Sequence, residues 1–321
     1  MTFVLLVQVP GSLDLDPRLR WYTLETEHFA VHFPSADQPA DDDLALAHNL
    51  CAVAEKTHDR LTSAAGWHPV SRTNVIVADF FDYSNGWAAP FPASTITVLP
   101  SLPAGDRTNY DDWLSTLFIH EYSHILEVDQ ARGWMAGLRR VFGRLALPNA
   151  LAPFWIHEGY AVYNETRFSR FGRNRGAEFR MMLDAAARER RLLPPDLCGS
   201  YELRRYPSGS APYLYGGLFY DWLARTQGPA FADSLNSLRS RSVPYTETAA
   251  LRRLTGKSMD KLWRNWQAEV QPGRPGPTMT RHITSDGFHK SSPVWSRSGS
   301  ELYYVSNTGL EYPCVRAVDS T

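Results

Sequence analysis

Two histidines and a glutamate lie within the short stretch His120-Glu121-Tyr122-Ser123-His124. Residues four apart lie on the same face of a helix, so the imidazoles of His120 and His124 could bind one metal ion together. Glu121 lies about 100° around the helix axis, where its carboxylate could take a proton from a water on that ion. The stretch therefore predicts a metal site able to activate water, provided that a helix and a third ligand surround it.

The surrounding sequence predicts the required helix. Thr108 and Asn109 are suitable N-caps, and Asp111 and Asp112 would lie in the first turn, where the helix dipole favours negative charge. Gly133 is the expected end of the helix. Apolar side chains recur at three- and four-residue spacing, which predicts one buried face: Trp113, Leu117, Phe118, Tyr122, Ile125 and Leu126.

A third ligand must come from elsewhere in the chain. One zincin branch continues as HExxHxxGxxH, but the later positions here are Glu127 and Gln130, which excludes that branch. Glu127 falls near the ligand face, yet a straight helix cannot bring three side chains to one tetrahedral ion. The other branch takes a glutamate from a second helix, and residues 153–165 offer one. Small residues at Gly159 and Ala161 predict close packing of this helix against the first.

Residues 155–163 read W-I-x-E-G-x-A-V-Y, and together with the HExxH motif they resemble the gluzincin (peptidase MA-like) metallopeptidases. The resemblance covers residues 21–270, with an insertion between the two motifs. It implies an α+β, zincin-like fold: a mixed sheet with an edge strand over the cleft, then a mainly helical subdomain. It also implies a zinc peptidase in which Glu158 joins His120 and His124 as ligands of one Zn²⁺, and Glu121 is the general base.

The resemblance also suggests where a peptide substrate binds. In gluzincins the strand before the metal helix is the sheet edge and pairs with the extended substrate backbone. That strand would be residues 94–100, with residues 85–90 as the rim of the cleft, and the expected substrate contacts are Gly86, Trp87, Ala88 and Ala89. Aminopeptidases of the group carry a glutamate in this segment to bind the free amine. Residues 85–101 contain no acidic side chain, which favours an endopeptidase over a strict aminopeptidase.

Two further side chains could take part in the reaction. Residues 212–216, P-Y-L-Y-G, resemble the P-Y-x-x-G start of a helix in aminopeptidase-type gluzincins, whose tyrosine donates to the oxyanion. That role falls on Tyr213, with Tyr215 as the competitor and a packed aromatic as the alternative. His157 could orient a metal histidine, touch substrate, or lie in solvent at the start of its helix.

Other elements follow from periodicity and from glycine or proline positions. We expect a strand or hairpin arm over residues 21–33, a helix over 41–65 that ends at Gly66, and a buried strand over 74–80. Residues 82–92 read as a loop, and residues 180–193 as a helix.

The insertion, residues 131–152, interleaves arginines with apolar side chains. Such a basic amphipathic segment could bind a membrane or a partner helix. We expect instead a loop or short helix that covers the cleft and packs its apolar face on the domain. The residues concerned are Arg132, Trp134, Met135, Leu138, Arg139, Arg140, Val141, Phe142, Arg144 and Leu145.

The two ends of the chain differ from the 21–270 domain. Residues 1–20 resemble the apolar part of a secretory signal without its basic leader. A truncated signal peptide, and hence an exported protein, is favoured over an ordinary first strand in a cytoplasmic one. Residues 271–277 read as a linker, and residues 278–321 resemble one blade of a TolB-like β-propeller, which needs several blades. The chain therefore looks like the front part of a longer protein.

Composition narrows the class of partner. Of the 321 residues in the chain, 43% are hydrophobic, which is enough for a large core and more than one domain. Its net charge of −1 gives no reason to expect nucleic acid. Cys51, Cys198 and Cys314 are too scattered for a disulfide framework or metal site, so free buried thiols are expected. No run approaches the ~20 apolar residues of a membrane span.

Two other functions fit the same motifs. The chain could be a catalytically silent scaffold that binds peptides, or a zinc hydrolase of non-peptide substrates, because related folds carry other reactions on this metal site. The filled positions of the motif favour a peptidase acting on a peptide or protein substrate.

Overall fold

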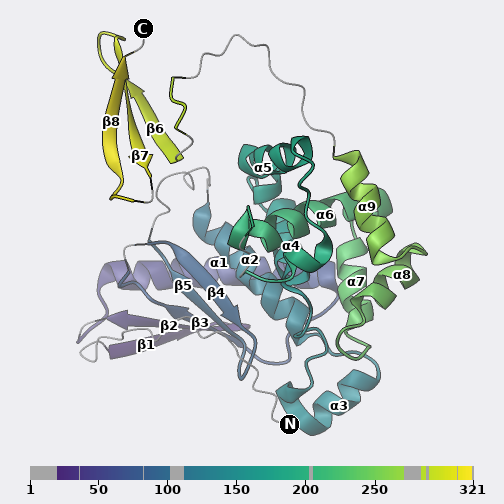
Figure 1. Ribbon diagram of the computed structural model, residues 1–321. Helices are drawn as coiled ribbons and strands as arrows, with labels where there is room; N and C mark the ends of the chain where they lie inside the picture. The colour runs from purple at the N-terminus through teal and green to yellow at the C-terminus, as the bar shows by residue number, and fades with distance from the viewer. Residues whose placement is uncertain are drawn as a thin grey trace. The chain divides into compact units, whose positions relative to one another are not determined.

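The computed structural model describes residues 20–35, 37–81, 83–101, 112–201, 205–270, 283–286, 289–308 and 310–319. The chain divides into two compact units, Met1–Leu102 with Tyr110–Pro272 and Pro103–Asn109 with Gly273–Thr321 (Figure 1). The expected signal segment, apart from Arg20, and the whole expected linker at 271–277 lie outside the described residues, so both stay predictions.

The first unit contains a mixed five-stranded sheet in the order β1-β2-β3-β5-β4. Its strands are β1 (Arg20–Glu25), β2 (Phe29–Ser35), β3 (Thr73–Val77), β4 (Asn85–Ala89) and β5 (Thr95–Leu99). The β1–β2 and β4–β5 pairs are antiparallel, whereas β3 runs parallel to both β2 and β5.

The edge strand expected at residues 94–100 is an interior strand. β5 lies between β3 and β4, and four of its five residues are buried. The sheet edge is β4, within the segment expected to be a loop, and its residues are half-buried or exposed. The prediction was wrong because the chain leaves β3, forms the outer strand β4 first and then turns back through the β4–β5 hairpin, which places β5 between β3 and β4.

The sheet and two helices form the first of two cores. Helix α1 (Asp41–Ala65) ends at Gly66 with φ +57°, as expected, and the Gly66 N–H donates to the Thr62 carbonyl. Buried side chains of β2, β3, β5, α1 and α2 (Trp113–Asp129) make up this core, among them Phe29, Leu50, Val75, Ile96, Phe118 and Ile125.

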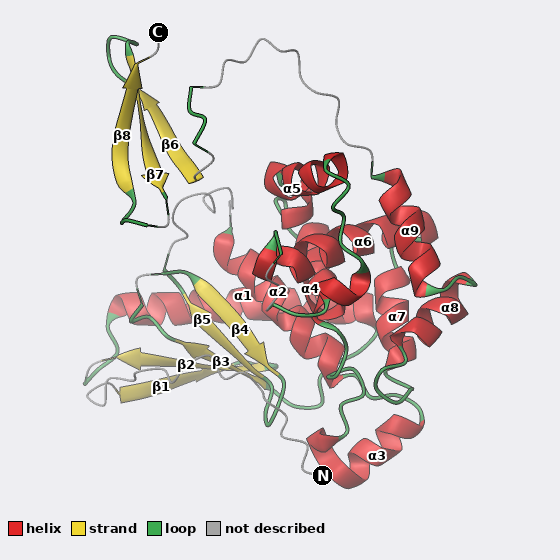
Figure 2. Cartoon of the chain, viewed as in Figure 1, coloured by secondary structure: helices red, strands yellow, loops and turns green. Residues whose placement is uncertain are grey.

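The mainly helical part of this unit follows α2 (Figure 2). Its helices are α3 (Trp134–Phe142), α4 (Phe154–Phe168), α5 (Ala177–Arg188), α6 (Ala211–Gln227), α7 (Phe231–Arg239), α8 (Glu247–Thr255) and α9 (Met259–Glu269), with 3₁₀ turns at η2 (Gly143–Leu145), η3 (Arg173–Arg175), η4 (Pro195–Cys198) and η5 (Ser208–Ser210). A second core joins α4 through α9 around Trp155, Phe219 and Trp263. The expected α+β class, with a mixed sheet followed by a helical subdomain, is confirmed.

Helix α2 differs from its expected ends. The Asp112 side chain is the N-cap and accepts from the Ser115 N–H at 3.0 Å, whereas residues 108–111 lie outside the described ranges. The helix ends at Asp129, because Gln130 is extended. Gly133, expected as the stop, has φ +58° and is the N-cap of α3 instead.

Of the two small residues expected to face α2, Gly159 packs against α6 instead. A Cβ on Gly159 would lie 2.7 Å from the Gly216 carbonyl carbon, and a Cβ on Gly216 would lie 2.2 Å from the Trp155 carbonyl oxygen. Glycine at both positions therefore lets the backbones of α4 and α6 approach closely, which fixes the helix that carries Glu158.

The insertion does not pack its apolar face on the domain as expected. Trp134, Val141, Phe142 and Leu145 are 55–76% exposed, and Met135 is the buried residue of α3. Figure 1 shows α3 at the edge of its unit, apart from the other helices. Two of its arginines, Arg139 and Arg144, turn inward and hold this segment through polar contacts, beside the buried Met135.

The second unit is a three-stranded antiparallel sheet of β6 (His289–Trp295), β7 (Glu301–Asn307) and β8 (Cys314–Asp319). Val294, Trp295 and Tyr303 on this sheet are exposed. A meander of this kind has the strand order of part of a propeller blade, and the identification with a TolB-like propeller stays a prediction. Within the described ranges, no helix is long and apolar enough to cross a membrane.

Candidate active site

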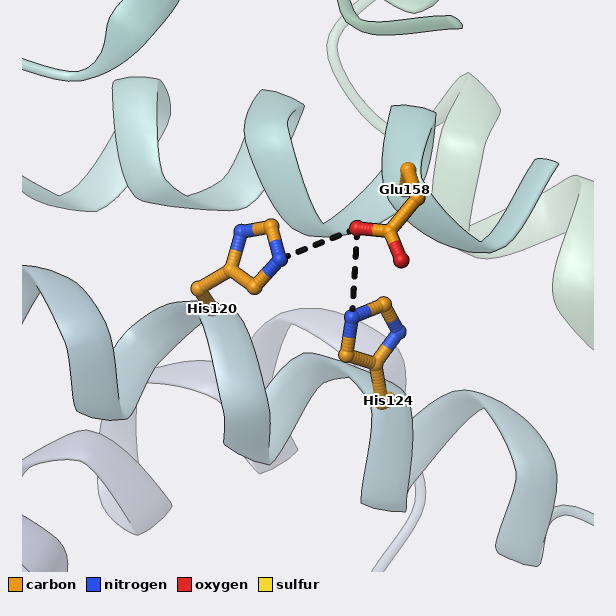
Figure 3. A group of neighbouring side chains, drawn as sticks. All are labelled: His120, His124 and Glu158. Atoms are coloured by element: carbon orange, nitrogen blue, oxygen red, sulfur yellow. Dashed lines mark hydrogen bonds and ion pairs between the residues drawn. The ribbon is translucent and has the colours of Figure 1, made fainter. Parts of the chain in front are cut away.

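Helices α2 and α4 bring the predicted ligands together (Figure 3). His120 and His124 project from successive turns of α2, and Glu158 projects from α4 between them. Glu158 Oε2 lies 3.1 Å from His120 Nε2 and 3.5 Å from His124 Nε2. Among the described residues, this is the one group of three or more such side chains whose ligand atoms converge, all within 4.8 Å.

The spacing of these atoms fits a zinc ion. Ligand atoms about 2.0–2.1 Å from a tetrahedral zinc are about 3.3–3.5 Å apart, close to the two separations to Glu158 Oε2. Two imidazole nitrogens and one carboxylate oxygen are also the donors that catalytic zinc sites use, with a fourth position left open. His120, His124 and Glu158 could therefore hold Zn²⁺.

Glu165 holds the other side of the His120 ring. Its Oε2 lies 3.1 Å from His120 Nδ1, and its side chain is fully buried. The remaining oxygen, Oε1, accepts from the Arg173 backbone N–H at 2.8 Å and faces the Arg173 Nε at 3.2 Å. A carboxylate on Nδ1 keeps the proton there and leaves Nε2 free to bind a metal.

The charged groups around His120 shift its protonation in the metal-free site. Burial and the neighbouring Arg173 lower the pKa of His120, but the carboxylates of Glu158 and Glu165 outweigh both and raise it to about 9. Burial raises the pKa of Glu121, against the opposing charges of His120 and His124. Glu121 is 6% exposed and lies on α2 next to the ligands.

Two tyrosines lie beside the ligands. The Tyr213 ring stacks on the His120 ring with centroids 5.9 Å apart. The Tyr201 hydroxyl donates to Oε1, the other oxygen of the Glu158 carboxylate, and its ring is 6.0 Å from that of Tyr213. Burial and the Glu158 charge raise the pKa of both tyrosines, so both hydroxyls keep their protons at neutral pH.

Tyr215, the competitor of Tyr213, lies in the helical core. Its ring stacks on Trp263, and its hydroxyl accepts from the Leu193 N–H at 3.3 Å. Of the two tyrosines in the P-Y-L-Y-G stretch, Tyr213 is therefore the one beside the metal ligands.

His157 and Glu127 belong to a buried ion-pair network rather than to the ligand set. Glu127 Oε2 lies 2.9 Å from His157 Nδ1, and Oε1 accepts from Arg239 Nη1 at 2.8 Å. Burial opposes ionisation, but the charges of His157 and Arg239 lower the pKa of Glu127 to about 2. His157 is therefore buried and paired with Glu127. This position differs from two of the roles considered for it, which were exposure to solvent and contact with a metal histidine.

The expected substrate segment lies on edge strand β4. Gly86, Trp87, Ala88 and Ala89 are half-buried, and among the described strands β4 pairs with β5 alone. A Cβ on Gly86 would lie 2.9 Å from the Leu117 side chain of α2, so the strand runs close to the metal helix. The edge strand β4 therefore lies beside α2, the helix that carries His120 and His124.

A second group of histidines surrounds His58 of α1. The rings of His28 and His58 stack with centroids 3.6 Å apart, and His68 lies 5.6 Å from His58. Burial and the neighbouring His28 lower the pKa of His58, which is 3% exposed. The titratable groups that face it are His28, Glu55, Asp59, His68 and Tyr122.

Sequence reasoning missed Glu165, Arg173 and Tyr201. Glu165 follows Glu158 by seven residues, two turns along the same face of α4, and that spacing could have revealed it. Arg173 and Tyr201 lie outside regular helices, in or after the η3 and η4 turns. No local pattern distinguishes them, because their contacts depend on the fold.

No protein-family model matches the sequence, and no curated protein matches it. Several solved structures are distantly similar to this chain. One is a mutant of a two-domain M1 zinc metallopeptidase bound to L-arginine, with 18% identity and a TM-score of 0.40. The match covers 78% of this chain and 51% of that one. Another is a mutant M1 zinc metallopeptidase from Deinococcus radiodurans bound to a Tyr-Ser-Ala substrate, with 19% identity and a TM-score of 0.40, covering 81% of this chain and 53% of that one.

An aminopeptidase N family protein from Idiomarina loihiensis has 14% identity and a TM-score of 0.34, covering 77% of this chain and 41% of that one. The chain spans about half the length of the two M1 metallopeptidases. Similarity at these identities and TM-scores supports no statement about activity. The activity depends on the site itself.

Proposed function

We propose that this chain is a zinc-dependent peptidase of the gluzincin type. The observation that carries the proposal is the position of Glu158 Oε2, which comes from α4 and lies 3.1 and 3.5 Å from the Nε2 atoms of two histidines on α2. Glu121 lies on the same helix, next to the ligands but outside the ligand set. This is the division of roles that an HExxH zinc hydrolase requires.

The side chains have distinct tasks in this reaction. A zinc ion in this site supplies Lewis acidity, which polarises a carbonyl group and acidifies water. Glu121 accepts the proton of the attacking water and passes it to the leaving amine. Tyr213 donates its hydroxyl to the oxyanion that forms on the scissile carbonyl. Glu165 keeps the His120 ring oriented with Nε2 toward Glu158.

The proposed substrate is an extended peptide or protein segment. It would add to the outer edge of β4, where the backbone of residues 86–89 supplies the hydrogen bonds. No acidic side chain between Asn85 and Ser101 is available to bind a free amine, which supports cleavage within a chain over strict removal of N-terminal residues.

Metal analysis combined with a peptide-library digest tests the proposal, using wild type and Glu121→Gln. We expect about one zinc per chain in both proteins, with cleavage by wild type and a loss of about 10²-fold or more in the variant. A wild-type protein purified without chelators that contains no zinc would overturn the metal assignment. Bound zinc without cleavage of any peptide would favour the silent scaffold, and turnover of esters alone would favour a non-peptide hydrolase.

Tyr213→Phe tests the oxyanion role. If the hydroxyl contacts the substrate mainly in the transition state, kcat should fall about 10²–10³-fold with little change in KM. Tyr215→Phe is the matched control, because it removes a hydroxyl from the core and should leave kcat unchanged. Equal kcat values for wild type and Tyr213→Phe would remove Tyr213 from the mechanism.

A further inference from the structure

Helix α3 and turn η2 present an unusual outer surface. Trp134, Val141, Phe142 and Leu145, here called the α3–η2 face, are 55%, 74%, 58% and 76% exposed. Single exposed apolar side chains are ordinary, but four large ones within twelve residues of one short segment indicate a contact surface on a folded protein.

Two arginines of the same segment, Arg139 and Arg144, point the other way. Arg139 donates to both the backbone carbonyl and the side chain of Asp129, whose carboxylate is fully buried. Arg144 lies 3.2 Å from the same carboxylate and donates to the Pro90 carbonyl at 2.6 Å and to Ser94 Oγ at 2.7 Å. Their side chains are 12% and 19% exposed.

These contacts reverse the usual arrangement of a surface helix. Such a helix ordinarily buries its apolar stripe and exposes its charges. Here the charges anchor the segment to α2 and to the β4–β5 connection, and the apolar side is left outside. Because Arg139, Arg144 and the buried Met135 already hold the segment in place, burial of the α3–η2 face is left to another body.

The charge around the face indicates what that body is. Residues 131–152 contain four arginines and no acidic residue. Arg140 is exposed within α3, and Arg241 is exposed with its side chain 3.8 Å from where a Cβ on Gly133 would lie, at the start of the helix. Exposed cationic side chains therefore flank the apolar face, one within α3 and one at its start.

We propose that the α3–η2 face binds peripherally to an anionic membrane surface. Trp, Phe and Leu side chains enter the boundary between headgroups and acyl chains, and the flanking arginines pair with lipid phosphates. The convex helix suits a lipid surface, which can deform around it. The proposal is independent of the metal site, because none of these residues is a ligand or a catalytic group.

Sedimentation of the full chain with lipid vesicles tests the proposal. One set of vesicles contains phosphatidylcholine, and the other contains phosphatidylcholine mixed with phosphatidylserine. We expect binding to the mixed vesicles, weakened by salt, and little binding to the neutral ones. The double variant Phe142→Ser/Leu145→Ser should reduce the partition coefficient at least about tenfold, and Arg140→Glu should reduce it about tenfold on anionic vesicles alone.

Val70→Ser is the matched control, because Val70 is 76% exposed and lies outside the segment. Its binding should equal that of wild type, and thermal unfolding should be unchanged in all variants. Wild type that binds neither vesicle, or a double variant that binds as wild type does, overturns the proposal. Light scattering that shows a wild-type dimer and a monomeric double variant also overturns it, because a second copy of the chain would then cover the face.

Discussion

Replacing Gly216 by alanine should force apart the two helices that support the metal site. A Cβ at this position would lie 2.2 Å from the Trp155 carbonyl oxygen and 2.9 Å from the Gly159 Cα. Both atoms belong to the backbone, so no side-chain rotation can relieve the overlap. To reach an ordinary contact, α4 and α6 must separate by about 1 Å, a backbone shift that costs about 1–3 kcal/mol or more.

The gain in helix propensity from glycine to alanine offsets about 1 kcal/mol of this cost at most. Because backbone atoms lie on both sides of the overlap, we expect the free energy of unfolding to fall by about 2 kcal/mol. For a domain of this size that lowers Tm by about 4–8 °C. Because Glu158 and Tyr213 lie on the separated helices, zinc affinity should fall as well.

Circular dichroism with heating measures the effect. Gly137→Ala in α3 is the matched control, since no atom outside its own helix backbone and chain neighbours lies within 4 Å of a Cβ there. It should leave Tm unchanged or raise it slightly, because alanine favours helix. A Tm for Gly216→Ala at or above that of wild type would refute the close approach of α4 and α6.

Three other outcomes follow from the buried polar groups. Tyr201→Phe removes the hydroxyl that donates to Glu158, so zinc affinity in competition with a chelator should weaken about 10–100-fold; an unchanged affinity would remove Tyr201 from the site. Glu127→Gln leaves Arg239 buried without its carboxylate and should cost about 3–5 kcal/mol in urea unfolding, whereas a cost below about 1 kcal/mol would contradict a buried pair. The lowered pKa of His58 favours its neutral form in the folded state. The unfolded chain therefore binds a proton at His58 more readily than the folded chain does. The stability present above the unfolded pKa of about 6.5 is lost as pH falls through the folded pKa. His58→Gln should flatten the decline of Tm between about pH 7 and pH 5, and an unchanged slope would assign that decline to other groups.

The sequence by itself determined the parts of the site that depend on local geometry. Residues four apart share a helical face, so the pairing of His120 with His124, and the place of Glu121 beside them, follow from spacing alone. Helix α1 was predicted to the residue because its apolar side chains have helical spacing and Gly66 marks its end. Glu158 could be named because its motif is a short, contiguous run of sequence.

The tertiary structure alone decided which distant groups meet. Tyr201 contacts Glu158 across 43 residues, and Arg239 contacts Glu127 across 112. The order of β4 and β5, the contact of Gly159 with α6 and the outward face of α3 likewise depend on how separate elements pack. Hydrophobic periodicity reports that one face of an element is buried, but it does not report which neighbour buries that face. For α3 it misleads, since the buried Asp129 draws Arg139 and Arg144 inward, while most of the large apolar side chains stay exposed.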